Sequence, residues 1–257
     1  MSEPELLYEV KDAVAWMTIN REARRNALSL EMIDLLSEYL DRVENDDNIR
    51  VICLTAAGEK AFCSGADLAT TFEGKEYEAG AKKFAEILKR MASFPKPIVA
   101  RVNGHCMAGG MGFMLSCDIV YAREGVKFGT PEVNVGLFPM MIGALIFRNA
   151  GRKKAMEMIY TARTLSASEA EETGLITRAV PREELDRVVD DALTTISAKA
   201  PIAIKLGRRA LAAVQDLNLS DALDHLCKQL GAVIDTEDAK EGLTAFMQKR
   251  KPEWKGR

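Results

Sequence analysis

The sequence predicts an α/β fold that ends in a helical C-terminal part. Strand-like and helix-like segments alternate up to about residue 180, and almost every later segment up to residue 249 has the pattern of a helix. The chain has 257 residues, which is enough for one large core and a smaller appendage. We therefore expect a core domain over residues 1–195 and a helical region over residues 196–257.

Short runs of strand-forming or continuously apolar residues mark the expected strands. These runs are residues 6–10, 13–19, 50–56, 98–102, 118–122, 126–129 and 176–180. The first two runs flank a turn expected at Lys11 and Asp12, so they predict a hairpin. Residues 58–68 follow the third run and contain two glycines, so we expect a loop there.

Apolar residues at helical spacing mark the expected helices. The helices before residue 180 cover residues 30–46, residues 76–93, the apolar run that ends near Cys117, and the chain that follows Pro139. Ser29 is a suitable N-cap for the first of them, and Pro95 and Pro97 end the second. In the segment 165–174 we expect Ser168 as an N-cap and Gly174 as the stop.

Composition excludes several classes of function. The net charge of −3 gives no general attraction to a polyanion, so we expect no nucleic-acid partner. The five cysteines form no CxxC pair and only two histidines are present, so we expect reduced thiols and no metal site. The acidic N-terminus lacks the apolar stretch of a signal peptide, and no segment has transmembrane length. We expect a cytoplasmic protein without a membrane partner.

The stretch NGHCMAGGMGFMLSCD at residues 103–118 places glycines where a buried helix is expected to begin. A helix N-terminus presents unpaired N–H groups, and glycines such as Gly109 and Gly110 let a ligand approach them. Tight packing of helix on sheet is the alternative explanation. The loop CSGADL at residues 63–68 also follows a buried strand. Two such loops suggest a pair of N–H donors on one oxygen, which is an oxyanion hole.

Several motifs together resemble one known family. The segment IVARVNGHCMAGGMGFMLSCDI resembles the signature of the enoyl-CoA hydratase/isomerase (crotonase) superfamily. The segments NREARRNALS, AFCSGADL, FGTPEVNVGLFP, GLITRAVP and AFMQKRKP fit it in order and spacing along nearly the whole chain. The resemblance implies a ClpP-like spiral of strand–strand–helix turns and a helical C-terminal region that forms a homotrimer or a hexamer. It also implies an acyl-CoA thioester substrate, with no cofactor besides this CoA.

The resemblance also assigns the catalytic residues. It implies that the backbone N–H groups of Ala66 and Gly109 hold the thioester oxygen and that Glu132 is the acid/base. Hydratases of the family carry a first glutamate at the position that is Gly112 here. Hydration is helped by two groups, whereas one base can shift a double bond, so we favour Δ3-Δ2 enoyl-CoA isomerisation. The alternative to a catalytic role is a structural one, in which Glu132 caps a helix or pairs with a basic side chain.

Further residues are implied in substrate binding. The resemblance implies that the CoA thioester bound by a subunit contacts these residues of the same subunit: Arg24, Arg25, Ala27, Ala66, Asp67, Leu68, Gly109 and Gly110. Phe246 and Lys249 match a segment that reaches the CoA of a neighbouring subunit. The two arginines are phosphate candidates, unless they are simply exposed without a ligand. Met140, Met141 and Ile142 replace a glycine-rich run of relatives, and they either line the acyl pocket or pack the core.

The sequence allows several other functions and several other site residues. A hydratase that uses one glutamate, a thioester or C–C bond hydrolase, and a non-catalytic binding protein are the alternatives to an isomerase. Glu73, Glu76 and Glu78 could reach the acyl pocket, although solvated positions are the simpler reading. We expect structural roles for His105 and Asp118. Cys63 and Cys106 lack the partners of a nucleophile.

Overall fold

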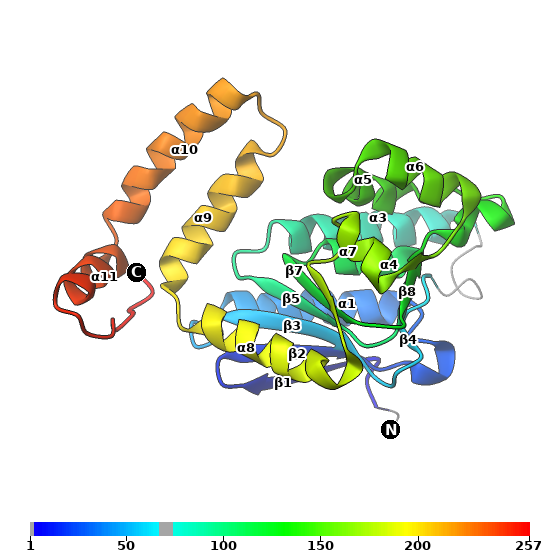
Figure 1. Cartoon of the computed structure of the whole chain (residues 1–257), viewed down its shortest axis with the longest axis horizontal. Coiled ribbons are helices and arrows are strands. Elements are labelled where there is room, and N and C mark those ends of the chain that lie inside the picture. Colours follow the sequence, from blue (N-terminus) through cyan, green and yellow to red (C-terminus); the bar gives the residue numbers. More distant parts are fainter. Residues whose placement is uncertain (1–2, 67–73) are drawn as a thin grey trace.

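The computed structural model describes residues 3–66 and 74–257, and its strands form two sheets (Figure 1). The first sheet has the order β1 (Leu6–Lys11), β2 (Val14–Ile19), β3 (Val51–Ala56), β5 (Ile98–Val102), β7 (Ile119–Arg123), β10 (Arg178–Val180). The second has the order β4 (Ala61–Cys63), β6 (His105–Met107), β8 (Lys127–Gly129), β9 (Leu165–Ser166). Only the outer pairs β1–β2 and β8–β9 are antiparallel among these described strands. The predicted α/β class is confirmed.

Helices cover both sheets and then form an arm that leaves them. The covering helices are α1 (Leu30–Glu44), α3 (Gly74–Ala92), α4 (Gly109–Leu115), α5 (Met140–Asn149), α6 (Arg152–Thr161), α7 (Ala167–Glu172) and α8 (Leu185–Ser197). The arm consists of α9 (Pro201–Val214), α10 (Leu219–Ile234) and α11 (Glu237–Met247), and Figure 1 shows it beside the sheets. The 3-10 turns are η1 (Glu22–Arg24), η2 (Pro131–Val135) and η3 (Arg182–Glu184). Among the described residues, no helix combines the length and the apolar character that a membrane span requires.

The first sheet is buried on both faces. Ile52 and Leu54 of β3 point into the main core, which also takes the apolar faces of α1, α3 and α4. Val51 and Cys53 of the same strand point the other way, toward α8. Because every residue of β3 is buried, its continuous apolar run correctly predicted a central strand.

Three local expectations need correction. The hairpin turns at Asp12 and Ala13, both with positive φ, because the tight turn that joins β1 to β2 needs that conformation at its two central residues. Helix α7 is capped by Ser166 and not Ser168, since Ser166 accepts from the Glu169 N–H while the Glu169 side chain accepts from the Ser166 N–H. Short strands at 61–63 and 105–107 stand where only loops were expected.

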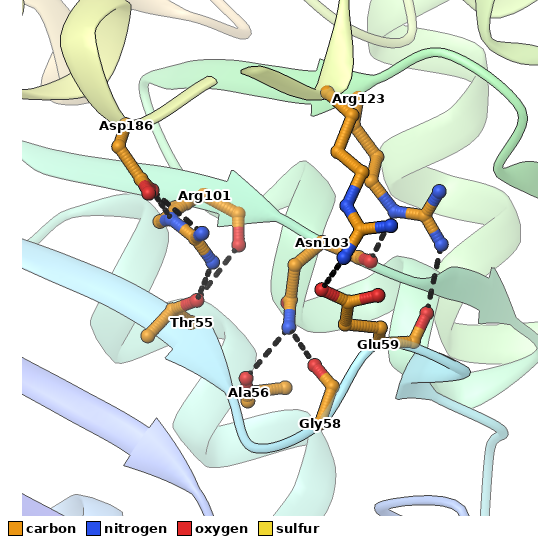
Figure 2. A network of polar contacts seen from close by, with 9 residues as sticks. Thr55, Ala56, Gly58, Glu59, Arg101, Asn103, Arg123 and Asp186 are labelled. Carbon is orange, nitrogen blue, oxygen red and sulfur yellow. Dashed lines mark hydrogen bonds and ion pairs between the residues drawn. The ribbon is translucent and has the colours of Figure 1, made fainter. Parts of the chain in front are cut away.

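A polar network ties the ends of β3, β5 and β7 together (Figure 2). Asn103 is buried, and its side-chain amide donates to the carbonyls of Ala56, at 2.8 Å, and Gly58. Arg123 donates to the Asn103 carbonyl and to that of Glu59. These bonds hold the chain that leads from β3 into β4, so they fix where the loop after β4 begins.

Several polar contacts attach the helical arm to the core, and the most buried of them are made by Arg208. Arg208 of α9 donates to the Phe94 carbonyl at 2.6 Å and forms an ion pair with Asp118. Asp118 also accepts from the Ile98 N–H at 2.8 Å, which confirms its predicted structural role. The predicted division at residue 195 falls in the last turn of α8, before α9 begins, and it stays a prediction.

The Asn103 network predicts a large loss of stability on truncation. Asn103→Ala removes the donor of one buried and one partly buried carbonyl, so we expect the free energy of unfolding to fall by about 2–3 kcal/mol. Asn45→Ala removes one exposed hydrogen bond and serves as the matched control, with a change within about 0.5 kcal/mol. Urea denaturation of both variants measures the difference, and equal losses would contradict the role of the network.

Candidate active site

Two loops that are far apart in sequence meet at the ends of β4 and β6. These strands are parallel neighbours, so the chain leaves both at the same edge of the second sheet. A Cβ atom placed on Gly65 would lie 2.7 Å from the Cβ of Ala108 and 3.5 Å from the Gly109 backbone nitrogen. A Cβ atom on Gly109 would lie 3.7 Å from the Ala66 nitrogen. The structure therefore brings the backbones of Ala66 and Gly109 together.

The N–H groups of these two residues are available as donors. The Leu28 N–H donates to the Gly65 carbonyl at 2.8 Å, so this bridge does not use the Ala66 N–H. Gly109 is the first residue of α4, where helix N–H groups have no partner inside the helix. Neither N–H donates a hydrogen bond to any residue that the structure describes. Ala66 and Gly109 both line one cavity.

Ala108 holds a strained conformation between β6 and α4. Its φ is 49° and its ψ is −130°, which costs an alanine about 1–3 kcal/mol. Two hydrogen bonds fix it: its N–H donates to the Gly129 carbonyl at 2.9 Å, and its carbonyl accepts from the Met111 N–H at 2.9 Å. The strain turns the chain so that α4 begins directly beside the loop of Ala66.

The glycines of the stretch have different roles. A Cβ atom on Gly110 would lie 2.6 Å from the Cβ of Cys63, so Gly110 packs α4 on β4. Gly110 is not among the described lining residues of the cavity, and the substrate contact that the family resemblance implied for it stays a prediction. A Cβ atom on Gly112 would lie 2.8 Å from Cγ2 of Ile142 and 3.0 Å from Cζ of Phe84. Apolar side chains therefore fill the space next to Gly112.

Glu132 lies on η2, lines the cavity and has one buried oxygen without a hydrogen-bond partner in the described structure. Its side chain is partly buried, and this oxygen, Oε2, is inaccessible to solvent. Burial raises the pKa of the Glu132 carboxyl, although a hydrogen bond from its own backbone N–H opposes this. No basic side chain of the described residues forms an ion pair with it, which argues against a merely structural role.

The cavity is mostly apolar and has a volume of about 540 Å³. Glu132 is the one ionisable side chain among its described lining residues. The apolar part of the wall includes Leu28, Leu30, Ile33, Phe84, Val135, Leu137, Phe138, Met140, Met141 and Ile142. Both expectations for the methionine segment hold in part: Met140 and Met141 line the cavity, while Ile142 also packs in the core.

The expected CoA loop lies next to the Ala66 loop. Arg24 and Arg25 are exposed, and the Arg25 carbonyl accepts from the Ser64 N–H at 3.2 Å. Asn26 holds this loop because its amide donates to the carbonyls of Ala57, at 3.0 Å, and Ala61, at 2.7 Å. Ala27 is buried, and its carbonyl accepts a hydrogen bond from Arg21.

The structure does not bring every predicted residue to this site. Asp67, Leu68 and Glu73 lie outside the described residues, and so does the side chain of Glu76. Glu78 is exposed. Phe246, in α11, and Lys249, just after it, are exposed and do not line the cavity of their own chain.

The predicted structural residues have structural contacts. His105 Nδ1 accepts from the Lys127 N–H at 2.9 Å. Burial raises the pKa of the Cys63 thiol to about 12 and that of Cys106 well above its usual range, so neither thiol is poised as a nucleophile. Phe84 and Leu28 were not predicted as site residues. Each belongs to an apolar pattern that is equally typical of core residues, so nothing in the sequence indicated that they line a cavity.

Together these features define one chemical capability. Two backbone donors can hold an oxygen that gains negative charge, and one carboxylate can move a proton beside it. In the described residues, no group of three or more His, Cys, Asp or Glu side chains could hold a metal ion.

Comparison with known proteins agrees with this geometry. Residues 9–257 match the model of the family "Enoyl-CoA hydratase/isomerase". The short-chain-enoyl-CoA hydratase of Clostridium acetobutylicum is 33% identical over 96% of this chain and 96% of that protein. The crotonyl-CoA hydratase of Syntrophomonas wolfei is 30% identical over 98% of each chain.

Solved structures give the same picture. An enoyl-CoA hydratase from Bacillus anthracis has a TM-score of 0.94 at 32% identity, covering 98% of this chain and 100% of that one. The human enoyl Coenzyme A hydratase domain-containing protein 3 has a TM-score of 0.93 at 31% identity, covering 97% and 100%.

Alanine at three glycines separates packing from function. A methyl group on Gly110 would lie 2.6 Å from the Cβ of Cys63. We therefore expect Gly110→Ala to lower the free energy of unfolding by about 1–3 kcal/mol. Gly109→Ala meets only the end of the Leu28 side chain at 3.0 Å, so it should fold but lose activity because its methyl group lies beside the Ala66 nitrogen. A methyl group on Gly143 in α5 would meet no atom within 4 Å, so Gly143→Ala should raise the free energy of unfolding by about 0.5–1 kcal/mol. Thermal unfolding of the three variants ranks them, and a well-folded Gly110→Ala would contradict the packing role.

Proposed function

Because the chain belongs to the enoyl-CoA hydratase/isomerase family, we propose that it shifts the double bond of a 3-enoyl-CoA to the 2-position. One observation carries this choice within the family. Glu132 is the one ionisable group on the described cavity wall, and apolar side chains occupy the space beside Gly112, where hydratases of the family carry a second carboxylate. Such a site is suited to chemistry that needs one base.

In this mechanism the Glu132 carboxylate removes a proton from C2 of the substrate. The electrons move onto the thioester oxygen, and the N–H groups of Ala66 and Gly109 stabilise the resulting dienolate. The protonated Glu132 then returns the proton to C4, and the double bond forms between C2 and C3. The raised pKa of Glu132 brings its proton affinity closer to that of a shuttle at neutral pH.

The CoA part would lie along the loop of Arg24 and Arg25. Both arginines are exposed and the loop contacts the chain next to Ala66, so phosphates on this side could reach them. Ala27, Asp67 and Leu68 belong to the same proposed surface. The acyl chain would enter the apolar half of the cavity along Met140 and Met141, whose flexible side chains adapt to different chains.

The helical arm would join copies of the chain. Its large apolar side chains are more than half exposed at Leu211, Leu219, Leu223, Leu230, Ile234, Leu243, Phe246 and Met247. Surfaces of this kind are usually covered by a partner. A trimer, or a hexamer made of two trimers, would cover them and would carry Phe246 and Lys249 to the CoA of a neighbouring copy.

Hydration of 2-enoyl-CoA is the second candidate. The solved structure from Bacillus anthracis and the relative from Clostridium acetobutylicum are named hydratases. The Glu132 side chain lines the cavity, so its carboxylate could also act on a water molecule there. The two candidates differ in whether one carboxylate is sufficient for the reaction.

Glu132→Gln tests the assignment of the base. We expect a fall in the isomerisation rate of about 10²–10⁴-fold, since the amide cannot accept the C2 proton. Binding of CoA, measured by calorimetry, should be unchanged, because the proposed CoA loop is separate from η2. Full activity of this variant would contradict the assignment.

The pH dependence follows from the raised pKa of Glu132. Below that pKa the carboxyl is protonated and cannot remove the C2 proton, so kcat/KM should fall as the pH falls. The midpoint of this fall should lie above 4.5, the ordinary value for a glutamate. A pH–rate profile on 3-enoyl-CoA measures it, and a midpoint at or below that value would contradict the burial of Glu132 as the cause.

A double substitution tests the role of Gly112. Gly112→Glu alone overlaps Ile142, so we combine it with Ile142→Ala to make room. This double variant should hydrate 2-enoyl-CoA at least tenfold faster than the original chain, because general acid–base groups contribute about 10²–10⁴-fold each. Gly112→Gln with Ile142→Ala is the matched control without a titratable group. Equal hydration by both variants would contradict the one-base account.

A further inference from the structure

A second cavity lies where the helical arm leaves the core. It has a volume of about 210 Å³ and is formed by the loop before β3, the loop before β5, the start of α9 and the C-terminal tail. We call it the joint cleft. Its charged lining residues are Asp47, Arg50, Lys96, Lys199, Lys205 and Lys255. The cleft shares no lining residue with the cavity of Glu132.

The joint cleft concentrates positive charge in a chain whose net charge is −3. Its described wall has five basic side chains and one acidic side chain, that of Asp47. The side chains of Arg50, Lys199, Lys205 and Lys255 form no ion pair or hydrogen bond with any described residue. Arg50, Lys96 and Lys205 are partly buried, so water screens their mutual repulsion incompletely and a negative group in the cleft would reduce it.

Lys96 shows how closely these charges are packed. Its ammonium group donates to the carbonyls of Val43 at 2.5 Å and Asp46 at 2.7 Å, at the end of α1. Burial lowers the pKa of Lys96, and the charges of Lys205 and Arg50 lower it further, while Asp46 and Asp47 oppose them. Lys96 is therefore a structural member of the wall that also adds to its field.

The N-terminus of α9 faces the same hollow. Ala200 is the N-cap residue and provides no side-chain cap, Pro201 has no N–H, and the first turn contains no acidic residue. Pro201, Ile202 and Ile204 of this turn line the cleft. The positive end of a helix is normally stabilised by negative groups, but here Lys199 and Lys205 flank it. An anion in the cleft would satisfy both the helix end and the lysines.

The C-terminal tail is anchored so that it completes this wall. Asp238 is almost fully buried and accepts from the N–H groups of Lys255 at 2.6 Å and Gly256 at 3.1 Å. The Trp254 indole donates to the Ala198 carbonyl at 2.8 Å, next to Lys199. The position of Lys255 is thus fixed by specific bonds, which is a feature of a built site rather than of a loose end.

We propose that the joint cleft binds a small anion that carries phosphate groups. Phosphate suits lysine and arginine donors together with a helix N-terminus, and the small volume favours one or two phosphate groups over a polymer. The bound anion would contact the loops of the core, the start of α9 and the tail together, so it would fasten the arm to the core. The inference does not depend on the reaction at Glu132.

Trp254 provides a local probe for the test. The chain has only two tryptophans, so Trp16→Phe leaves Trp254 as the single tryptophan, beside the cleft, and selective tryptophan excitation reports on it alone. We would titrate this variant with inorganic pyrophosphate at constant ionic strength and follow its fluorescence. We expect a saturable change, and a rise in the thermal midpoint as pyrophosphate is added.

Adding Lys205→Gln and Lys255→Gln to this background should weaken pyrophosphate binding at least about tenfold, because each removes a charged donor. Lys153→Gln, an exposed lysine of α6, is the matched control and should bind like the background. Each variant should unfold at the same temperature or higher without pyrophosphate, since removing a crowded cation relieves repulsion. A linear, unsaturable response, or equal binding by the cleft and control variants, would overturn the proposal.

Discussion

The close approach of two backbone segments is the constraint on which the site depends. The loop after β4 and the loop after β6 can meet only because Gly65 carries no side chain and because Ala108 accepts a strained turn. Two neighbouring features support that contact. Gly110 lets α4 pack on Cys63, and the Asn103 network fixes the chain that enters β4. The parallel pairing of β4 with β6 then places both sets of N–H groups at one cavity.

The chemistry follows from what surrounds that contact. The cavity offers two backbone donors, one partly buried carboxylate and an otherwise apolar described wall. The position where hydratases of the family carry another carboxylate is Gly112, and Ile142 and Phe84 close the space beside it. The three atoms nearest to a Cβ placed on Gly112 all belong to apolar side chains and lie within 3.3 Å of it, so no polar group there could orient a water molecule unless the packing changed. These features support the proposal of a site that stabilises an enolate and relies on one base.

Much of this could be predicted from the sequence, because the signals were local or belonged to a motif. The apolar run predicted the central strand β3, and Ser29 as N-cap predicted where α1 begins. The motif around Gly109 pointed to the site. The sequence could not show that Gly110 packs on Cys63, since a glycine reads the same in either role. Nor could it place Ser166 over Ser168, or find the short strands β4 and β6, whose partners are far away in the chain.

The most direct test is product analysis in deuterated water. Purified protein would be incubated with a 3-enoyl-CoA in D₂O and followed by proton NMR. A 2-enoyl-CoA product without a 3-hydroxyacyl signal is the result expected from one base and apolar side chains beside Gly112, and little deuterium at C4 is expected because Glu132 returns the proton that it removed. Prompt and complete conversion to 3-hydroxyacyl-CoA would contradict the account, because it would show that the site positions water as well as a proton.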